Sequence, residues 1–283
     1  MNRVDLHSHS TVSDGSFPPE EVVRMAAEAG LAGLALTDHD NIGGVEIALK
    51  AGETEGILVI PGVEISAEFD RGTCHILGYL FDPTNEILRG KLDTLQRARA
   101  ERNPKIARKL QELGIDITYE EVQAIAGSEQ VGRPHFARIL MDKGIVQDFN
   151  EAFDRFLGKD RAAYVDKFRY QPEEAFEMIR AAGGVVVLAH PYTLNLSDDE
   201  LTDLLGRWIK LGLQGMEVFY PDHTEEMIAR YSQIADTFGL IKTGGSDFHG
   251  NNKEGSVLGD CGPRGCPTAD VIGQLKNSTE KAS

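Results

Sequence analysis

Short apolar runs recur along the 283-residue chain, and stretches with helical spacing separate most of them. Several runs are rich in β-branched residues and alternate little between apolar and polar positions, as expected of buried parallel strands. The pattern predicts seven strands, at residues 4–7, 33–37, 58–66, 75–80, 185–189, 215–219 and 240–244, the third broken at Pro61 and Gly62. The alternation with helices predicts a parallel α/β fold, and seven strands favour a barrel over an open sheet.

The strand pattern stops between Leu80 and Val185, where the sequence instead has helical spacing. We therefore predict a small helical insert at residues 100–170, within a barrel formed by residues 1–99 and 171–283. Elsewhere, PPEEVVRMAAEAG from Pro18 and QPEEAFEMIRAAGG from Gln171 have Pro and Glu near the start and Gly at the end. Both features are typical of the two ends of a helix.

Composition limits the classes of protein that fit. The chain is 41% hydrophobic, which is enough for one full core, or for a core with a small insert. The net charge of −16 argues against a general nucleic-acid coat or a membrane-surface protein. Charge is uneven: residues 97–169 contain 14 Lys and Arg against 12 Asp and Glu, and the remainder contains 15 against 33. Acidic cation sites beside a basic segment that binds an anion would give this pattern, and so would ordinary scatter of surface charge.

No apolar run approaches the roughly 20 residues of a membrane span, and the N-terminus lacks the apolar core of a signal peptide. We therefore expect a soluble, cytoplasmic protein with no membrane partner. Three cysteines, Cys74, Cys261 and Cys266, fit a reducing compartment. Without a second Cys pair, CGPRGC is interpreted as a loop with two incidental thiols rather than a zinc site.

Histidines and carboxylates recur where the predicted strands end. His75 begins the fourth strand, and the others follow or end strands one, two, three, five and seven: His7, His9, His39, Glu64, His190, Asp247 and His249. In a parallel barrel the carboxyl ends of the strands share one rim, where active sites are built. A lone His at a strand end is usually structural, but convergence of so many on one rim predicts a metal site.

Imidazole and carboxylate without thiolate suit Zn, Mn, Fe or Ni. With Asp14 there are nine candidate ligands, which is too many for one ion and suits two or three. Two ions about 3.5–4 Å apart can bridge a hydroxide and clamp a transferring phosphoryl group.

The motifs DLHSHSTVSDG, ALTDHD, PGVEIS, LAHP and GSDFH, in this order, resemble those of the polymerase-and-histidinol-phosphatase (PHP) family. The resemblance implies a distorted (βα)7 barrel that holds three divalent metal ions. Carried over by motif, the first ion takes His7, His9 and Asp247, and the second takes His75 and His190, with Glu64 bridging the two. The third takes Asp14, His39 and His249.

Many members of the family have a histidine where this chain has Asp14. A carboxylate is a harder ligand, so we expect Mn, with Zn or Fe as alternatives. The shape of the chain, with RNP and GRPH in the insert, resembles the nucleoside 3′,5′-bisphosphate phosphatases within the family. Some relatives of that subgroup are 5′-to-3′ exonucleases on short RNA.

The insert contains two stretches of similar design, ERNPKIARKLQELG and GRPHFARILMDKG, each with a Pro where a helix could begin. Arg102, Asn103 and Lys105 flank the first predicted start, and Arg133 and His135 flank the second. Free N–H groups at a helix start suit a phosphate, and Arg adds a bidentate donor. We therefore predict that these residues bind the 5′-phosphate of the substrate; plain helix capping is the alternative.

Catalytic roles follow from the same rim. We expect Asp247 to orient or deprotonate the nucleophile, and His190, His223 or His249 to assist the leaving ribose oxygen. His223 lies after strand six and could instead contact the transferred phosphate, or serve only as a cap. Three aromatic residues near the rim, Tyr192, Phe219 and Tyr220, could stack on a base or belong to the core.

These features together predict a metal-dependent phosphoesterase that removes the 3′-phosphate from nucleotides such as 3′-phosphoadenosine 5′-phosphate. A 5′-to-3′ exoribonuclease on short 5′-phosphorylated RNA is one alternative. A histidinol-phosphate phosphatase is another, although its cationic substrate suits the basic insert poorly. A nucleotide-binding regulator with structural metal ions is the non-enzymatic alternative, and no protein partner is predicted.

Overall fold

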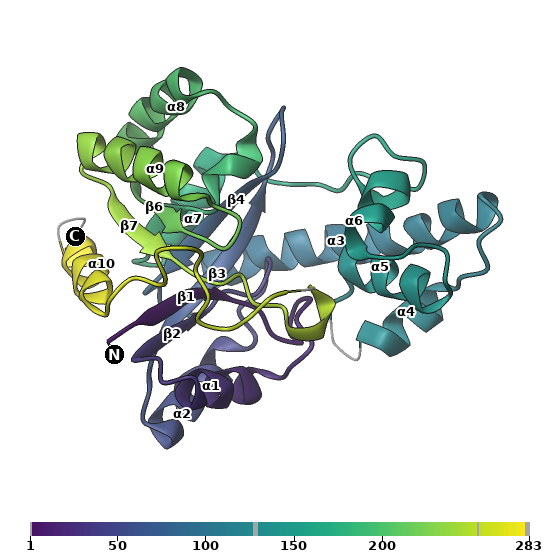
Figure 1. The fold of residues 1–283 in the computed structure, drawn as a ribbon, viewed down its shortest axis with the longest axis horizontal. Coiled ribbons are helices and arrows are strands. Elements are labelled where there is room, and N and C mark those ends of the chain that lie inside the picture. The colour runs from purple at the N-terminus through teal and green to yellow at the C-terminus, as the bar shows by residue number, and fades with distance from the viewer. Residues whose placement is uncertain (1, 127–129, 254, 281–283) are drawn as a thin grey trace.

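The computed structural model describes residues 2–126, 130–253 and 255–280, and within them seven strands form one curved sheet in sequential order (Figure 1). The strands are β1 (Val4–Ser8), β2 (Gly33–Leu36), β3 (Leu58–Ala67), β4 (Cys74–Tyr79), β5 (Val185–Leu188), β6 (Leu213–Phe219) and β7 (Ile241–Gly244). All seven predicted strands are confirmed within a residue or two. A bridge between Ser8 and Phe248 brings the two edges of the sheet together, as in a distorted barrel.

β3 is continuous through Pro61 and Gly62, so the predicted break there is wrong. The strand changes partner at this point instead. Up to Pro61 it pairs with β2 in parallel, and from Gly62 onward it pairs with β4 in antiparallel register. Gly62 allows the close approach, because a Cβ at this position would lie 2.6 Å from the Leu36 carbonyl oxygen.

β4 is antiparallel to both of its neighbours, which corrects the prediction of an all-parallel sheet. Only six residues connect Ala67 to Cys74, too few for the crossover that a parallel pair needs. The reversal explains the place of His75. The start of an antiparallel strand lies at the carboxyl end of its neighbours, and His75 pairs with Ser66 at that end of β3.

Helices cover the outer faces of the sheet (Figure 1). They are α1 (Pro19–Glu28), α2 (Val45–Glu55), α7 (Pro172–Ala181), α8 (Asp198–Leu211), α9 (Glu225–Phe238) and α10 (Asp270–Glu280), with short 3₁₀ turns at Pro191–Leu194 and Gly250–Asn252. The two helices with predicted starts, α1 and α7, begin at Pro19 and Pro172. Apolar faces of α7 and α8 pack on the sheet through Phe176, Ile179 and Trp208. No helix in the described part of the chain is long and apolar enough to cross a membrane.

Between β4 and α7 the chain forms helices that extend to one side of the barrel (Figure 1). They are α3 (Glu86–Glu112), α4 (Tyr119–Ala126), α5 (Arg133–Asp142) and α6 (Phe149–Ala152), followed by a π-helical turn at Phe153–Leu157. The first half of α3 packs on the barrel core through Leu88 and Leu92. Its second half joins a separate hydrophobic cluster, where Ile106 and Leu110 meet residues of α5. One helix thus belongs to both cores.

Pro104 lies inside α3, so the prediction that a helix begins there is wrong. A proline inside a helix removes one backbone hydrogen bond. Here it is exposed, and packing on both sides of it, at Leu95 and Ile106, holds the helix together. The second predicted start is confirmed, because α5 begins at Arg133 with Pro134 in its first turn.

Cys261 and Cys266 form a disulfide, which corrects the interpretation of CGPRGC as a loop with incidental thiols. Gly262 and Gly265 have φ values of 89° and 71°, in the left-handed region that glycine adopts readily. The loop therefore folds back on itself and brings the two Cα atoms to 4.8 Å. Cys74 is free and buried.

Candidate active site

All nine predicted metal ligands converge at the rim of the barrel. They come from the end of β1 and the loop after it, from the loops after β2, β5 and β7, from β3 and from the start of β4: His7, His9, Asp14, His39, Glu64, His75, His190, Asp247 and His249. Seven of them are buried, and His39 and His75 are partly exposed. The sheet topology therefore assembles residues from opposite ends of the chain into one cluster.

Glu64 lies at the centre of the cluster. Its Oε1 is 2.8 Å from His75 Nδ1 and 3.0 Å from His190 Nε2. Its Oε2 lies 3.0–3.3 Å from nitrogens of three further imidazoles, those of His7, His9 and His39. Burial alone would raise the pKa of Glu64, but the imidazoles around it outweigh burial and lower the pKa well below its usual value. Glu64 is thus an ionised carboxylate with both oxygens directed at possible metal positions.

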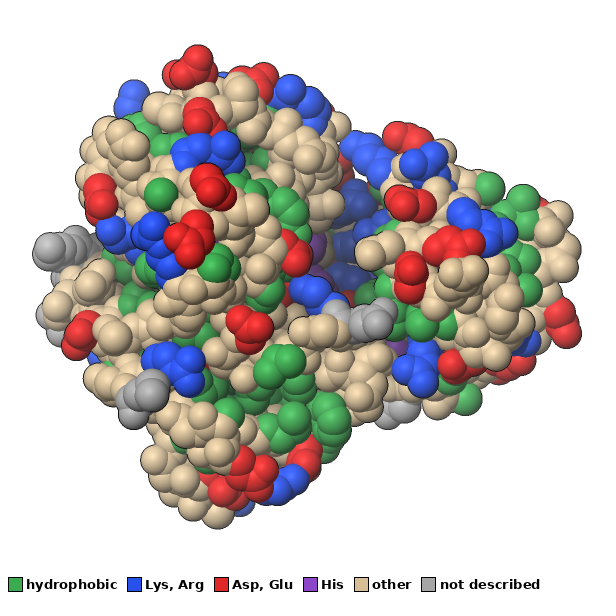
Figure 2. Space-filling model, viewed as in Figure 1, with side chains coloured by type: hydrophobic (Ala, Val, Ile, Leu, Met, Phe, Trp, Pro, Cys, Tyr) green, Lys and Arg blue, Asp and Glu red, His purple; other side chains and the backbone are tan. Residues whose placement is uncertain are grey.

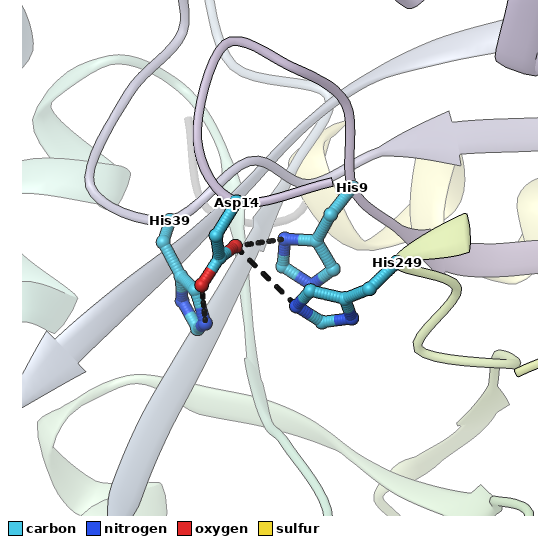
Figure 3. A group of neighbouring side chains, drawn as sticks. All are labelled: His9, Asp14, His39 and His249. Atoms are coloured by element: carbon cyan, nitrogen blue, oxygen red, sulfur yellow. Dashed lines mark ion pairs between the residues drawn. The ribbon is translucent and has the colours of Figure 1, made fainter. Parts of the chain in front are cut away.

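A second group surrounds Asp14 (Figure 3). Its Oδ1 lies 3.3 Å from His249 Nε2 and 3.9 Å from His9 Nδ1, and its Oδ2 lies 3.9 Å from His39 Nε2. The other nitrogen of His9 faces Glu64 and Asp247, so His9 stands between this group and the rest of the cluster. The sequence assigned His9 to the first ion only, whereas in the structure its second nitrogen, Nδ1, also faces the Asp14 group.

The nitrogen and oxygen atoms of the cluster are arranged to bind metal ions rather than to form hydrogen bonds with one another. Among the described residues, five buried atoms of the cluster lie 3.0–3.9 Å from a possible ionic partner but have no hydrogen-bond partner: His7 Nε2, His9 Nδ1, His9 Nε2, His39 Nδ1 and Glu64 Oε2. Buried polar atoms normally have hydrogen-bond partners. Buried nitrogen and oxygen atoms that point toward one another without such partners would be satisfied by a metal ion between them. Imidazole nitrogens and carboxylate oxygens are suitable ligands for several divalent metals.

Partners behind the cluster orient its ligands. His7 Nδ1 lies 3.0 Å from Glu217 Oε1, and the other oxygen of Glu217 accepts the backbone N–H of His190 at 2.8 Å. Metal-binding histidines commonly use one nitrogen in this way, so that the other is held toward the ion. Sequence reasoning missed Glu217, although a fully buried Glu between Met216 and Val218 in an apolar strand is itself a signal.

A cavity of about 360 Å³ opens beside the metal-ligand cluster. Asp14, His39, His75 and His249 line one side of it. The other side is lined by six cationic residues: Arg99, Arg102, Arg133, Lys159, Lys167 and Arg169. Figure 2 shows this hollow between the barrel and the insert, with Lys and Arg side chains gathered on its inner wall. We refer to these six residues as the cationic wall.

Arg102 is the most unusual member of the cationic wall, because it is 3% exposed and has no acidic partner. Its Nε and Nη2 both donate to Asn103 Oδ1, at 3.1 and 2.8 Å, and Asn103 in turn donates to the Val131 carbonyl. Within the described residues no carboxylate lies within 4.0 Å of the Arg102 guanidinium. Burial, together with repulsion from three neighbouring arginines, lowers its pKa well below the usual value. A buried cation of this kind calls for an anion from solution.

Asp40 balances part of the cationic wall. Its Oδ2 lies 2.6 Å from Arg99 Nη2 and 3.2 Å from Lys167 Nζ. Burial, together with repulsion from nearby arginines, outweighs the attraction of Asp40 and lowers the pKa of Lys167 to about 7. Arg99, Lys167 and Arg169 were not singled out in the sequence, because charged residues on a helix or loop are usually solvated.

The structure separates the predicted substrate-binding residues. Arg133 lines the cavity, donates to the Leu157 carbonyl and lies over the rings of Phe153 and Tyr164. Lys105 lies on the exposed face of α3 and does not line the cavity. His135 is buried, and its Nδ1 accepts the Gly132 N–H at 2.9 Å, which caps α5.

His223 lies outside the metal-ligand cluster and is buried at 1% exposure. Its Nδ1 is 2.8 Å from the Val218 carbonyl oxygen, so Nδ1 donates, and Nε2, which has no partner in the part of the chain that the structure describes, is a free acceptor. Burial lowers its pKa, which keeps the ring neutral at pH 7. Tyr192 and Tyr220 contact its ring. The remaining rim aromatic residue, Phe219, is partly buried and packs against the barrel core.

Comparison with known proteins places this geometry in context. The PHP domain family matches residues 5–241. The chain is 35% identical over 260 residues to a 3′,5′-nucleoside bisphosphate phosphatase of Chromobacterium violaceum, covering 92% of this chain and 91% of that protein. It is 37% identical over 250 residues to a 5′-3′ exoribonuclease of Haemophilus influenzae, covering 87% and 90%. A solved structure of an amidohydrolase from Chromobacterium violaceum, with bound sulfate and no metal, superposes with a TM-score of 0.88 at 32% identity, covering 98% of this chain and 96% of that one.

Proposed function

The chain belongs to the PHP domain family and is a phosphoesterase, and we propose that it removes the 3′-phosphate from nucleoside 3′,5′-bisphosphates. One observation carries the proposal: a buried guanidinium without an acidic partner, Arg102, lines a cavity whose other side is the metal-ligand cluster. A substrate with two phosphates satisfies both sides. The cationic wall would bind the 5′-phosphate while the 3′-phosphate lies at the metal ions.

The ligands divide into three sets that would hold three divalent ions, with Mn as the expected metal. One set is His7, His9 and Asp247, a second is His75 and His190 with Glu64 shared, and a third is Asp14, His39 and His249. Bound ions would supply Lewis acidity and lower the pKa of water, so that no Ser or Cys nucleophile is needed. The chain's own contribution is to orient these ligands through Glu217 and to hold the nucleotide with the cationic wall.

The hydrogen bonding and the pKa of His223 limit the role that this residue can have in the reaction. With Nδ1 donating to the Val218 carbonyl and a lowered pKa, His223 has a free acceptor at Nε2 rather than a proton to give. We therefore propose that it accepts a hydrogen bond from a substrate hydroxyl or from water. The proton for the leaving ribose oxygen would then come from water, because His249 Nδ1 likewise lies against a backbone carbonyl and His190 Nδ1 against the Thr193 hydroxyl, while both rings are assigned to metal ions.

A 5′-to-3′ exoribonuclease is the second candidate, because the relative of 37% identity has that name and the cationic wall suits a 5′-phosphate in either case. Histidinol phosphate fits less well, because its cationic amine would face the cationic wall. A regulator without turnover would not need ligands for several ions beside a substrate-sized cavity.

The test is phosphate release by the protein with Mn(II), comparing 3′-phosphoadenosine 5′-phosphate, AMP, 3′-AMP and histidinol phosphate. We expect fast release from the bisphosphate, slow release from 3′-AMP, and AMP left intact. Equal rates on the bisphosphate and on 3′-AMP would refute the role of the cationic wall. No release from any of these, with AMP formed from short 5′-phosphorylated RNA, would favour the exoribonuclease; inactivity on RNA as well would favour the regulator.

A further inference from the structure

The two oxygens of Asp247 face different surroundings. Oδ1 points into the metal-ligand cluster and lies 3.1 Å from His9 Nε2 and 3.3 Å from His7 Nε2. Oδ2 points away from the cluster and lies 2.8 Å from both the Tyr220 hydroxyl and Lys253 Nζ. Lys253 Nζ is also 3.2 Å from the Tyr220 hydroxyl, so the three groups form a closed triangle.

The backbone supports this division. Asp247 has a φ of 50°, in the left-handed region that a residue with a side chain rarely adopts. Such conformations persist only where the surrounding structure holds them. The Asp247 carbonyl is engaged as well, because it lies 2.8 Å from His249 Nδ1. The Asp247 side chain is therefore held in one orientation by contacts on three sides.

Lys253 plays no part in the cavity. It follows Asp247 by six residues on the same loop, does not line the cavity and lies 5.3 Å from the centre of the Tyr220 ring. A lysine this close to a group of divalent ions repels them, so its presence lowers metal affinity and needs a compensating role. The only acidic side chain within ion-pair distance of it in the described residues is that of Asp247.

We propose that Lys253 and Tyr220 clamp Oδ2 of Asp247, restrict Asp247 to one-oxygen metal binding and weaken its hold on the ion, which leaves that ion a stronger Lewis acid. The proposal rests on the metal-dependent function proposed above. Under it, Lys253 is a positioning residue that acts through Asp247 and does not contact substrate. It also means that Asp247 cannot serve as a base, since both oxygens are engaged, in contrast to the role expected from the sequence.

The experiment compares Lys253→Met with Lys242→Met, in the full chain. Lys242 is a matched control because it also pairs with a carboxylate, Asp236 at 2.7 Å, and its side chain is 35% exposed against 33% for Lys253. Mn(II) affinity is measured by calorimetry on metal-stripped protein without substrate. The kcat and KM for the bisphosphate are measured at saturating Mn(II).

We expect Lys253→Met to bind Mn(II) about 10-fold more tightly, because the substitution removes a cation. Replacing a group that contacts a metal ligand typically changes metal affinity by about 10-fold or more, although such replacements usually weaken binding. We also expect kcat to fall at least 10-fold while KM stays unchanged. Tyr220→Phe should change affinity and kcat in the same directions by less, and Lys253→Arg should recover part of kcat. Lys242→Met should match the wild type in every measurement.

Three results would overturn the clamp. Unchanged or weaker Mn(II) binding by Lys253→Met would show that Lys253 is an ordinary ion-pair partner. A raised KM with unchanged metal affinity would show that Lys253 contacts the substrate. Lys253→Met could also fail to fold, as judged by circular dichroism. If the milder Tyr220→Phe then bound Mn(II) with wild-type affinity, the pair would have a structural role. The affinity measurement needs no substrate, so it stands even if the proposed substrate is wrong.

Discussion

Replacing Arg102 with Met tests whether the cationic wall recognises a 5′-phosphate. Arg102 is 3% exposed, and among the described residues only its Nε and Nη2 have a hydrogen-bond partner, the neutral amide oxygen of Asn103. Hydrogen bonds to charged groups are worth about 1.5–3 kcal/mol each. Loss of one such interaction with a phosphate would weaken binding roughly 10- to 150-fold, since 1.4 kcal/mol corresponds to a factor of ten.

The assay measures kcat/KM of Arg102→Met on 3′-phosphoadenosine 5′-phosphate and on 3′-AMP, which lacks the 5′-phosphate. We expect the value to fall roughly 10- to 150-fold for the bisphosphate, mostly through KM, and to stay nearly constant for 3′-AMP. Arg108→Met is the control, because Arg108 lies on the exposed face of the same helix and does not line the cavity.

Thermal unfolding completes this test. The substitution leaves the buried Asn103 oxygen without its donor, at a cost of about 1–3 kcal/mol. It also removes a buried cation without an acidic partner, and replacing buried charge with an apolar group is often neutral or stabilising by about 1–4 kcal/mol. We therefore expect the Tm to change by only a few degrees. An equal loss of activity on both substrates, or a collapse of the Tm, would refute the reasoning, because Arg102 would then support the fold or the metal site.

Three further predictions concern other parts of the molecule. Glu64→Gln keeps the shape of the central ligand but removes its charge, so we expect it to lose bound Mn by atomic absorption and at least 100-fold in kcat; full metal occupancy in the variant would contradict the proposed shared ligand. The pKa of about 7 at Lys167 means that this lysine is charged at pH 6 and largely neutral at pH 8.5, so affinity for AMP should fall about 10-fold between them. AMP itself gains negative charge over that range, which works in the opposite direction, and Lys167→Met should abolish the decrease; the same decrease in that variant would exclude Lys167 as its cause. Reduction of the Cys261–Cys266 disulfide should lower the free energy of unfolding by about 2 kcal/mol, from the loop it closes; urea unfolding with and without dithiothreitol measures this, and a double Cys→Ser variant that still responds to the reductant would contradict it.

The strands, and the convergence of the candidate metal ligands on one rim, could be predicted from the sequence because their signals are local. Apolar β-branched runs mark buried strands, and the ligands follow those runs directly. The orientation of β4 was missed, although the six residues that separate it from β3 already exclude a parallel crossover. The rule that rim residues lie at the carboxyl ends of parallel strands does not apply to His75, which begins its strand. His75 nevertheless lies at the rim, because β4 is antiparallel to its neighbours.

Residues that act through tertiary contacts were harder to predict. Glu217, Tyr220 and Lys253 reach the ligands from other strands and loops, and no local pattern links them to His7 or Asp247. Arg99 and Lys167 belong to the same cavity only because α3 and the segment that leads from the insert to α7 lie against each other. Pro104 illustrates the reverse problem. Its local preference for a helix start is overridden by packing on both sides of it.

The continuity of α3 also restricts how proteins of this architecture can change in length. This helix is fixed on the barrel near Leu92 and carries Arg102 and Leu110 onward into the insert. An α-helix turns about 100° and rises about 1.5 Å per residue. One added residue between Leu92 and Arg102 would therefore rotate the whole insert by more than a quarter turn and carry its cations away from the metal ions. Seven added residues would restore its direction to within about 20°, some 10 Å farther out. Natural variation and engineering of the distance between the two phosphate positions should therefore proceed in steps of whole helical turns.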